Sequence, residues 1–149
     1  QWELACGLAL ATGAVGPHTL TARSLRCEGA TCLVAAAGGA GIDGALALLQ
    51  AWVLARLGAR PGLDLREANA PVAARARALV ACLATEQGLC SAAAVARHFR
   101  RAKATLSEQM AARRQSPVDR VILATPVQRI VDEALALQAD PASLPQDRP

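Results

Sequence analysis

The sequence has very few aromatic residues, and this restricts the kind of core that it can build. It contains no Tyr and one Phe, and aromatic residues make up 2% of its 149 residues. Hydrophobic residues still make up 53%, so a sizeable core has to consist mainly of Ala, Leu, Val and Ile. Strands favour aromatic and β-branched side chains, whereas Ala and Leu favour helices. The composition therefore predicts a mostly α-helical protein, folded as a small helical bundle.

Histidine is also scarce, which argues against catalysis. The two histidines, His18 and His98, lie far apart in the sequence, and neither belongs to a recognisable catalytic motif. A Ser or Cys nucleophile would need a neighbouring base such as His to activate it. We therefore expect a protein that is not an enzyme.

Long apolar runs and a recognisable secretory leader are missing as well. No stretch reaches the roughly 18–20 apolar residues that a membrane span requires. The apolar segment 4–15 is shorter and follows no basic residues, unlike a signal peptide. The number of cysteines, five, is odd, which favours reduced thiols over a disulfide framework. These features predict a cytoplasmic protein without membrane contact.

Two of the cysteines, Cys27 and Cys32, form a C-x4-C pair with Cys6 and His18 nearby. Zinc motifs usually contain C-x2-C pairs, so this is a loose match and remains a minor alternative. We expect buried or free thiols, and no cofactor.

Positive charge is concentrated in the middle of the chain. Residues 66–114 contain nine basic and three acidic groups, whereas residues 1–65 contain four of each, and residues 115–149 contain three basic and five acidic groups. A basic block between neutral and acidic flanks is typical of a surface that binds a polyanion. A solvated basic surface without a partner is the alternative.

Apolar periodicity predicts helices from residue 42 onward. Apolar residues recur there every three or four positions, as on one face of a helix. The first helix is expected to begin at the N-cap Asp43 and to stop at Gly58. After a loop, Pro71 begins a second helix that Gly88 ends.

Further helices are expected toward the end of the chain. Ser91 caps a short helix, and another helix covers residues 103–114. Ser116 and Thr125 are each followed by Pro and are expected to begin two further helices. Residues 121–123 would alternatively suit a short strand.

The chain therefore divides into four segments. A poorly defined segment covers residues 1–41 and contains a short strand at Thr31–Ala35. The main helical domain covers residues 42–115, and C-terminal helices cover residues 116–139. The tail over residues 140–149 holds three Pro and is expected to be disordered.

Residues 91–114 have the spacing of a helix-turn-helix. Ala96 is the small residue that lets the second helix pack closely, and Leu106 is the aliphatic anchor on that helix. The second helix would then turn Lys103, Ala104, Thr105, Ser107 and Gln109 outward. A helix of this size fits the major groove of DNA, where such side chains meet base edges and phosphates. Basic residues on either side would neutralise phosphates, namely Arg100, Arg101, Arg113 and Arg114.

The segments Arg75–Ala84, Gly88–Phe99 and Lys103–Ser107 resemble the C-terminal DNA-binding domain of the replication initiator DnaA. They resemble even more the DnaA-like domain appended to REP-associated tyrosine transposases. The resemblance covers roughly residues 45–114, and it implies that Arg75 and Arg77 contact the DNA backbone while the helix from Lys103 reads the groove. The chain has neither the Tyr nucleophile nor the His-x-His metal site of those transposases.

The resulting hypothesis is a nucleoid-associated, transposase-derived or regulatory protein that binds double-stranded DNA without nuclease activity. A second copy of the chain is a further candidate partner. The predicted DNA-binding residues are Arg75, Arg77, Ser91, Arg100, Arg101, Lys103, Ala104, Thr105, Ser107, Gln109, Arg113 and Arg114.

Three positions depart from the family pattern. The turn residue that is usually Gly is Arg100, which would be strained by about 1 kcal/mol if its φ is positive. The expected N-cap of the second helix is Ala102, which caps worse than Ser by roughly 1 kcal/mol. Glu108 stands where the family often has a basic residue, and its charge would repel phosphate.

Two alternatives belong to other functional classes. Residues Gly39–Gly44 match the G-x-G-x-x-G fingerprint of NAD- or FAD-binding domains, with Asp64 at the distance expected of the ribose-binding acid. This fingerprint needs a strand before it, which the segment Thr31–Ala35 would supply. The other alternative is a helical protein-interaction module that assembles through the helix at 126–137.

Overall fold

The computed structural model describes residues 22–139, and their side chains from Gly29 onward. Within this range it contains seven α-helices and no strand, which confirms the predicted mostly α-helical bundle. The helices are α1 (Ala22–Ala36), α2 (Gly41–Arg56), α3 (Pro71–Glu86), α4 (Ala92–Phe99), α5 (Lys103–Gln115), α6 (Pro117–Leu123) and α7 (Val127–Ala139).

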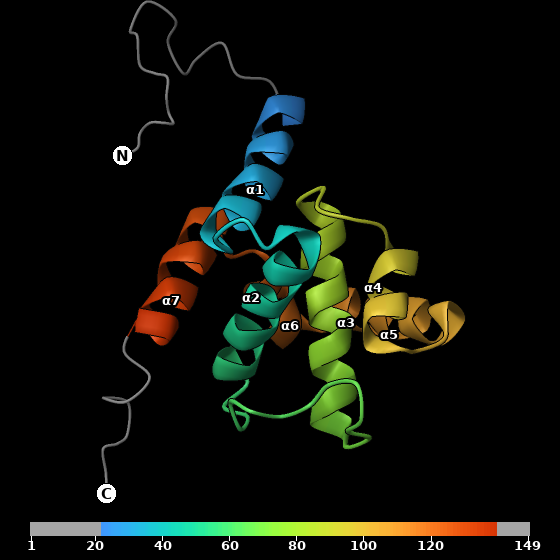
Figure 1. Cartoon of the computed structure of the whole chain (residues 1–149). Coiled ribbons are helices and arrows are strands. Elements are labelled where there is room, and N and C mark those ends of the chain that lie inside the picture. The colour runs from blue at the N-terminus through green and yellow to red at the C-terminus, as the bar shows by residue number, and fades with distance from the viewer. Residues whose placement is uncertain (1–21, 140–149) are drawn as a thin grey trace, which may run out of the picture.

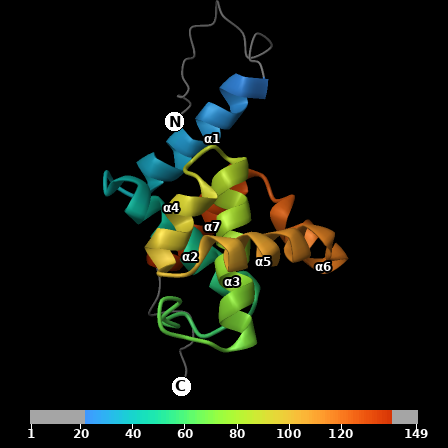
Figure 2. The ribbon, with the colours of Figure 1, turned by 90° about the vertical axis from the view of Figure 1, so that its right-hand side faces the viewer.

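Helix α3 is the centre of the fold. It contacts α2 on one side and α4 and α5 on the other, and it also contacts α6, while α1 and α7 pack on α2 and on each other (Figure 1). Figure 2 shows α5 crossing α3, with α6 continuing beyond the end of α5. The pair α4–α5 therefore lies at the edge of the bundle, away from α1 and α7.

The core consists of small and aliphatic side chains, as the composition predicts. On α3, every residue from Ala76 to Ala84 is buried, so this helix has no solvent-facing stripe along that stretch. The many Ala residues let four neighbouring helices approach it closely. Leu79 and Leu83 are fully buried, and each contributes roughly 1.5–3 kcal/mol of hydrophobic stabilisation. The large rings of Trp52 and Phe99 fill the remaining space.

Local signals in the sequence determine most helix ends. Gly58 and Gly88 follow the ends of α2 and α3 with φ of 67° and 75°, a conformation that favours Gly. Pro71 opens α3, as predicted. Helix α2 differs from the prediction, because it begins at Gly41, and Asp43 lies in its first turn instead of capping it.

The predicted strand at Thr31–Ala35 is wrong, because these residues belong to α1. Leu33 is fully buried among the helices, and Gly29 of the same helix lies directly against Gln87 at the end of α3. A Cβ at Gly29 would overlap the end of the Gln87 side chain as it lies here, so that flexible side chain would have to move aside. Residues 121–123 are also helical, within α6. The predicted tail at 140–149 and most of the segment 1–41 before α1 lie outside the described residues.

No single helix in the described range is long and apolar enough to cross a membrane. The segments Gly29–Ala36 and Gly41–Arg56 meet the criteria of length and composition only when taken together, and they are bent by 89°.

Candidate nucleic-acid interface

Helices α4 and α5 are joined by a turn of three residues, Arg100–Ala102. Arg100 adopts the left-handed conformation, with φ 57° and ψ 46°, and it is the only residue other than Gly with a positive φ in the described range. The turn is closed by backbone N–H groups of Arg100 and Arg101, which donate to the carbonyls of Arg97 and Ala96. Since a side chain costs about 1 kcal/mol in this conformation, position 100 carries the strain expected where the motif usually has Gly.

The two helices share one buried seam. Ala96 is 3% exposed, and its small side chain lets α5 lie close to α4. On α5 only Leu106 and Met110 are buried, and both belong to the same hydrophobic core as Val95 and Phe99 of α4. The predicted packing residues Ala96 and Leu106 are therefore placed as expected. The rest of α5 is left largely to solvent.

The outward residues of α5 form the face that the sequence predicts. Lys103, Ala104 and Thr105 are exposed, while Ser107 and Gln109 are half-buried. Glu108 is exposed on the same helix and adds a negative charge. No side chain caps the N-terminus of α5, because the residue at that position is Ala102. The first N–H groups of α5 therefore remain open donors at the positive end of the helix dipole.

Three cations near the start of α5 have no side-chain partner among the described residues. Arg97, Arg100 and Lys103 are exposed, and none forms a hydrogen bond or ion pair through its side chain with another described residue. Arg97 was not among the predicted site residues. Its position one turn before Arg100, on a short helix whose apolar side is Val95–Ala96–Phe99, is the sequence signal that would have identified it.

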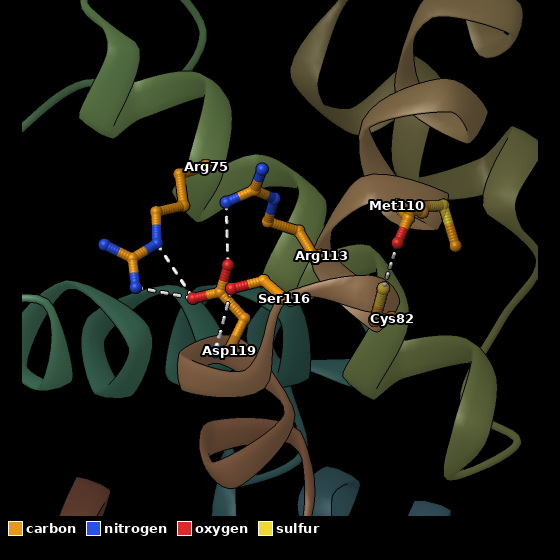
Figure 3. Close-up of polar contacts among 6 residues, drawn as sticks. All are labelled: Arg75, Cys82, Met110, Arg113, Ser116 and Asp119. Atoms are coloured by element: carbon orange, nitrogen blue, oxygen red, sulfur yellow. Dashed lines mark hydrogen bonds and ion pairs between the residues drawn. The ribbon is translucent and has the colours of Figure 1, made fainter.

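Arg75 and Arg113, which the sequence predicts to bind phosphate, are both paired with an acid of the protein itself. Both donate to the carboxylate of Asp119, which is 1% exposed (Figure 3). Arg75 reaches it through Nη2 and through Nε at 2.9 Å, and Arg113 reaches it through Nη1 at 2.7 Å. The hydroxyl of Ser116 caps α6 by accepting from the N–H of Asp119. This cluster ties α3, α5 and α6 together, and its charge is largely neutralised within the protein.

Arg77 is also placed differently from the prediction. It is 5% exposed and donates through Nη1 to the carbonyls of Leu65 and Ala68, each at 2.9 Å. Burial, and then the charge of Arg101, lower the pKa of Arg77 from its ordinary value. Other helices surround α3 at this point, so the side chain is engaged inside the protein, and its contact with the DNA backbone stays a prediction that this placement does not favour.

The remaining predicted site residues have mixed roles. Ser91 caps α4 by accepting from the N–H of Ala94 at 3.1 Å. Arg101 turns back onto the loop before α3, where it contacts Asn69. Arg114 is 45% exposed and lies 3.8 Å from Glu86. Of the two arginines, Arg114 is the more exposed, and Glu86 partly compensates its charge.

Burial affects the thiols of two described cysteines, Cys82 and Cys90. Cys82 is fully buried and donates to the carbonyl of Met110, and burial raises the pKa of this thiol to about 11. Burial also raises the pKa of Cys90. Among the described residues, no group of three or more His, Cys, Asp and Glu side chains is arranged to hold a metal ion. Cys6 and His18 of the loose zinc motif lie outside the described residues, as does the side chain of Cys27.

The glycine-rich segment Gly39–Gly44 lacks the context of a dinucleotide fingerprint. It follows helix α1 rather than a strand, and α2 begins within it at Gly41. The fingerprint places a phosphate between a strand of a parallel sheet and the next helix. No sheet is present in residues 22–139.

Comparisons with protein-family models, with curated proteins and with solved structures find no match to this chain. The resemblance to DnaA-like domains therefore rests on the residues that carry it. Function has to be argued from the geometry around α4 and α5.

Proposed function

We propose that this protein binds duplex DNA without catalysing a reaction, using α4 and α5 as a helix-turn-helix. The observation that carries this proposal is the exposure of α5. Leu106 and Met110 are the only buried residues of this helix, and most of its remaining surface faces solvent at the edge of the bundle. Its uncapped N-terminus lies beside Arg100 and Lys103, whose side chains are exposed and have no ion-pair partner in the described part of the chain.

The dimensions of α5 suit the major groove. An α-helix with its side chains is about 10–12 Å wide, and the major groove of B-DNA is about 12 Å wide. Lys103, Thr105 and Gln109 supply hydrogen-bonding groups for base edges or phosphates, and Ala104 permits close approach. Recognition helices commonly contact bases with their N-terminal residues, where these side chains are found.

Phosphate contacts are assigned to Arg97, Arg100 and Lys103. Arg75, Arg77 and Arg113 are engaged inside the protein, so fewer cations remain for DNA than the charge of the sequence suggests. Three phosphate contacts give a salt slope near −2.7, which corresponds to a roughly 40-fold loss of affinity between about 50 and 200 mM salt. Glu108 opposes binding, so we expect moderate affinity, in keeping with a regulatory or transposase-derived role.

The test is fluorescence anisotropy with a labelled duplex of mixed sequence across this salt range. Wild-type protein should bind with the stated salt dependence, and Lys103→Glu should weaken binding at least tenfold. Arg129→Glu is the charge-matched control, since it makes the same change of two charges on α7, which packs on α1 and α2. Absence of binding at low salt, or equal loss with both variants, would reject the proposal.

A further inference from the structure

Helix α6 exposes apolar side chains that the rest of the described fold leaves uncovered. Four large hydrophobic residues are exposed in the described range, and three of them lie on α6 and α7, namely Val118, Val121 and Leu135. Val118 and Val121 are each 66% exposed, more than the other two. The helix lies beyond the end of α5, at the periphery of the bundle (Figure 2). Single exposed apolar residues are ordinary, whereas a group of them on one element marks a contact surface.

An open hollow lies along the outer face of α6. Its volume is about 450 Å³, and its lining residues are Pro117, Arg120, Val121 and Ala124. Positions 117, 121 and 124 fall on one side of a helix, because they are separated by four and three residues. Asp119 and Ile122 are buried on the opposite side. Since two ion pairs hold the carboxylate of Asp119, the outer face of α6 is presented in a fixed orientation.

Arg120 gives this apolar face a single positive charge. It is the only charged residue of α6 that is exposed, and its side chain forms no hydrogen bond or ion pair with another described residue. An occupant of the face therefore has to bring an aliphatic side chain for the hollow and a carboxylate for the guanidinium of Arg120.

The outer face of α7 carries both of these groups. Asp132, Leu135 and Ala139 are separated by three and four residues, so they form one stripe along the helix. All three are exposed, and the buried residues of α7 lie on its other side, namely Ile130, Val131 and Ala134. The carboxylate of Asp132 accepts from Nε2 of Gln128 at 3.0 Å, which engages one of its two oxygens. The other oxygen is left for a cation.

These two faces do not meet within one molecule. Helix α6 packs on α3 and α5, whereas α7 packs on α1 and α2. Arg120 and Asp132 form no ion pair with each other in the described chain. The complementary charge and shape therefore point to a contact between two copies.

We propose that the outer face of α6 docks on the outer face of α7 of a second copy of this chain. In this contact Arg120 pairs with Asp132 of the other copy, and Leu135 of that copy enters the hollow. Because the two faces differ, each copy can bind one neighbour through α6 and another through α7. The contact does not rest on the proposed function, since α6 and α7 hold none of the residues that we assign to DNA.

The size of the contact sets its strength. A stable interface buries roughly 800 Å² on each partner, which takes about 20–30 residues a side. The outer face of α6 offers five exposed residues, namely Pro117, Val118, Arg120, Val121 and Ala124. We therefore expect weak, reversible association with a Kd of roughly 0.1–1 mM, the range of small transient interfaces.

Sedimentation equilibrium of the whole chain tests the contact. The mean mass of wild type should rise between about 10 μM and 1 mM, the range that brackets the expected Kd. Arg120→Asp and Asp132→Arg each place like charges opposite one another and should weaken association at least about tenfold. Arg60→Asp is the charge-matched control for Arg120→Asp, because Arg60 is exposed on the loop between α2 and α3. It should associate as wild type does.

Mixing the two variants provides the decisive measurement. In an equimolar mixture, Asp at position 120 of one variant meets Arg at position 132 of the other, so association should return to about the wild-type level. This result also excludes misfolding as the cause of the loss. Wild type that stays monomeric throughout would overturn the proposal and leave α6 to a different protein. Unchanged association of either variant alone, or no recovery in the mixture, would overturn it as well.

Discussion

The buried carboxylate of Asp119 on α6 accepts from Nη1 of Arg113 on α5, at 2.7 Å, and holds the end of the exposed helix in place. Arg75 of α3 binds the other oxygen of the same carboxylate (Figure 3). Asp119 thus links α3, α5 and α6. The two arginines that bind it stabilise the fold by ion pairing within the protein.

Asp119→Asn should destabilise the protein by about 2–3 kcal/mol. Removing one partner of a buried ion pair leaves uncompensated charge, although Arg75 and Arg113 are 34% and 27% exposed, which reduces the loss. Chemical denaturation measures the effect. Asp132→Asn, on the exposed side of α7, should change stability by less than about 0.5 kcal/mol. Equal effects of the two variants would contradict a structural role of Asp119.

Arg100→Gly should stabilise the fold by about 0.5–1 kcal/mol while weakening DNA binding. Gly adopts the positive φ of 57° without strain, although it gains entropy in the unfolded chain. The matched control Arg97→Gly lies inside α4 and should destabilise by about 1 kcal/mol. Thermal unfolding shows whether each variant is more or less stable than wild type. A loss of stability in both variants would show that the turn at Arg100 is not strained.

The contact between α2 and α7 should weaken in acid through Glu133. Hydrogen bonds from Trp52 and then from Arg129 lower the pKa of this carboxylate. A lowered pKa adds stability above the unfolded-state value of about 4.5, and this stability disappears as the pH falls through the lower folded-state value. Because Glu133 is 38% exposed, the effect should amount to a few tenths of a kcal/mol.

Trp52 fluorescence, followed in a Trp2→Phe background, reports this contact. The emission should change as the pH falls below about 4.5, and Glu133→Gln should remove the change. Persistence of the transition in Glu133→Gln would assign it to another group.

Cys82 should resist alkylation in the folded protein. Its thiol has a pKa of about 11 and is fully buried, so thiolate at pH 8 is scarce and inaccessible. Because the folded-state pKa lies above the ordinary value of 9.0, stability is complete below that pH and declines as the pH rises toward 11. Cys82→Ala should show a smaller decline between these two pH values. Rapid modification of Cys82 in native protein at pH 8 would contradict this prediction.

Local sequence patterns predicted much of the bundle. Ser91 and Ser116 cap their helices, Gly58 and Gly88 terminate theirs, and Leu106 anchors α5, because each signal acts within a few residues of the backbone that it shapes. The prediction of a strand at 31–35 was wrong because its local signal is ambiguous. A short apolar run does not distinguish a strand from a buried helix, and here the packing of Leu33 and Gly29 accompanies the helical form.

The sequence by itself determined the helical class, most helix ends, and which side of α5 is buried. Only the tertiary structure decided which partners the arginine side chains bind. Arg75 and Arg113 meet Asp119, Arg77 is enclosed by neighbouring helices, and Arg101 turns back onto a distant loop. Charge and periodicity act along the chain, whereas the partner of a long cationic side chain depends on which segments the fold brings within a few ångströms.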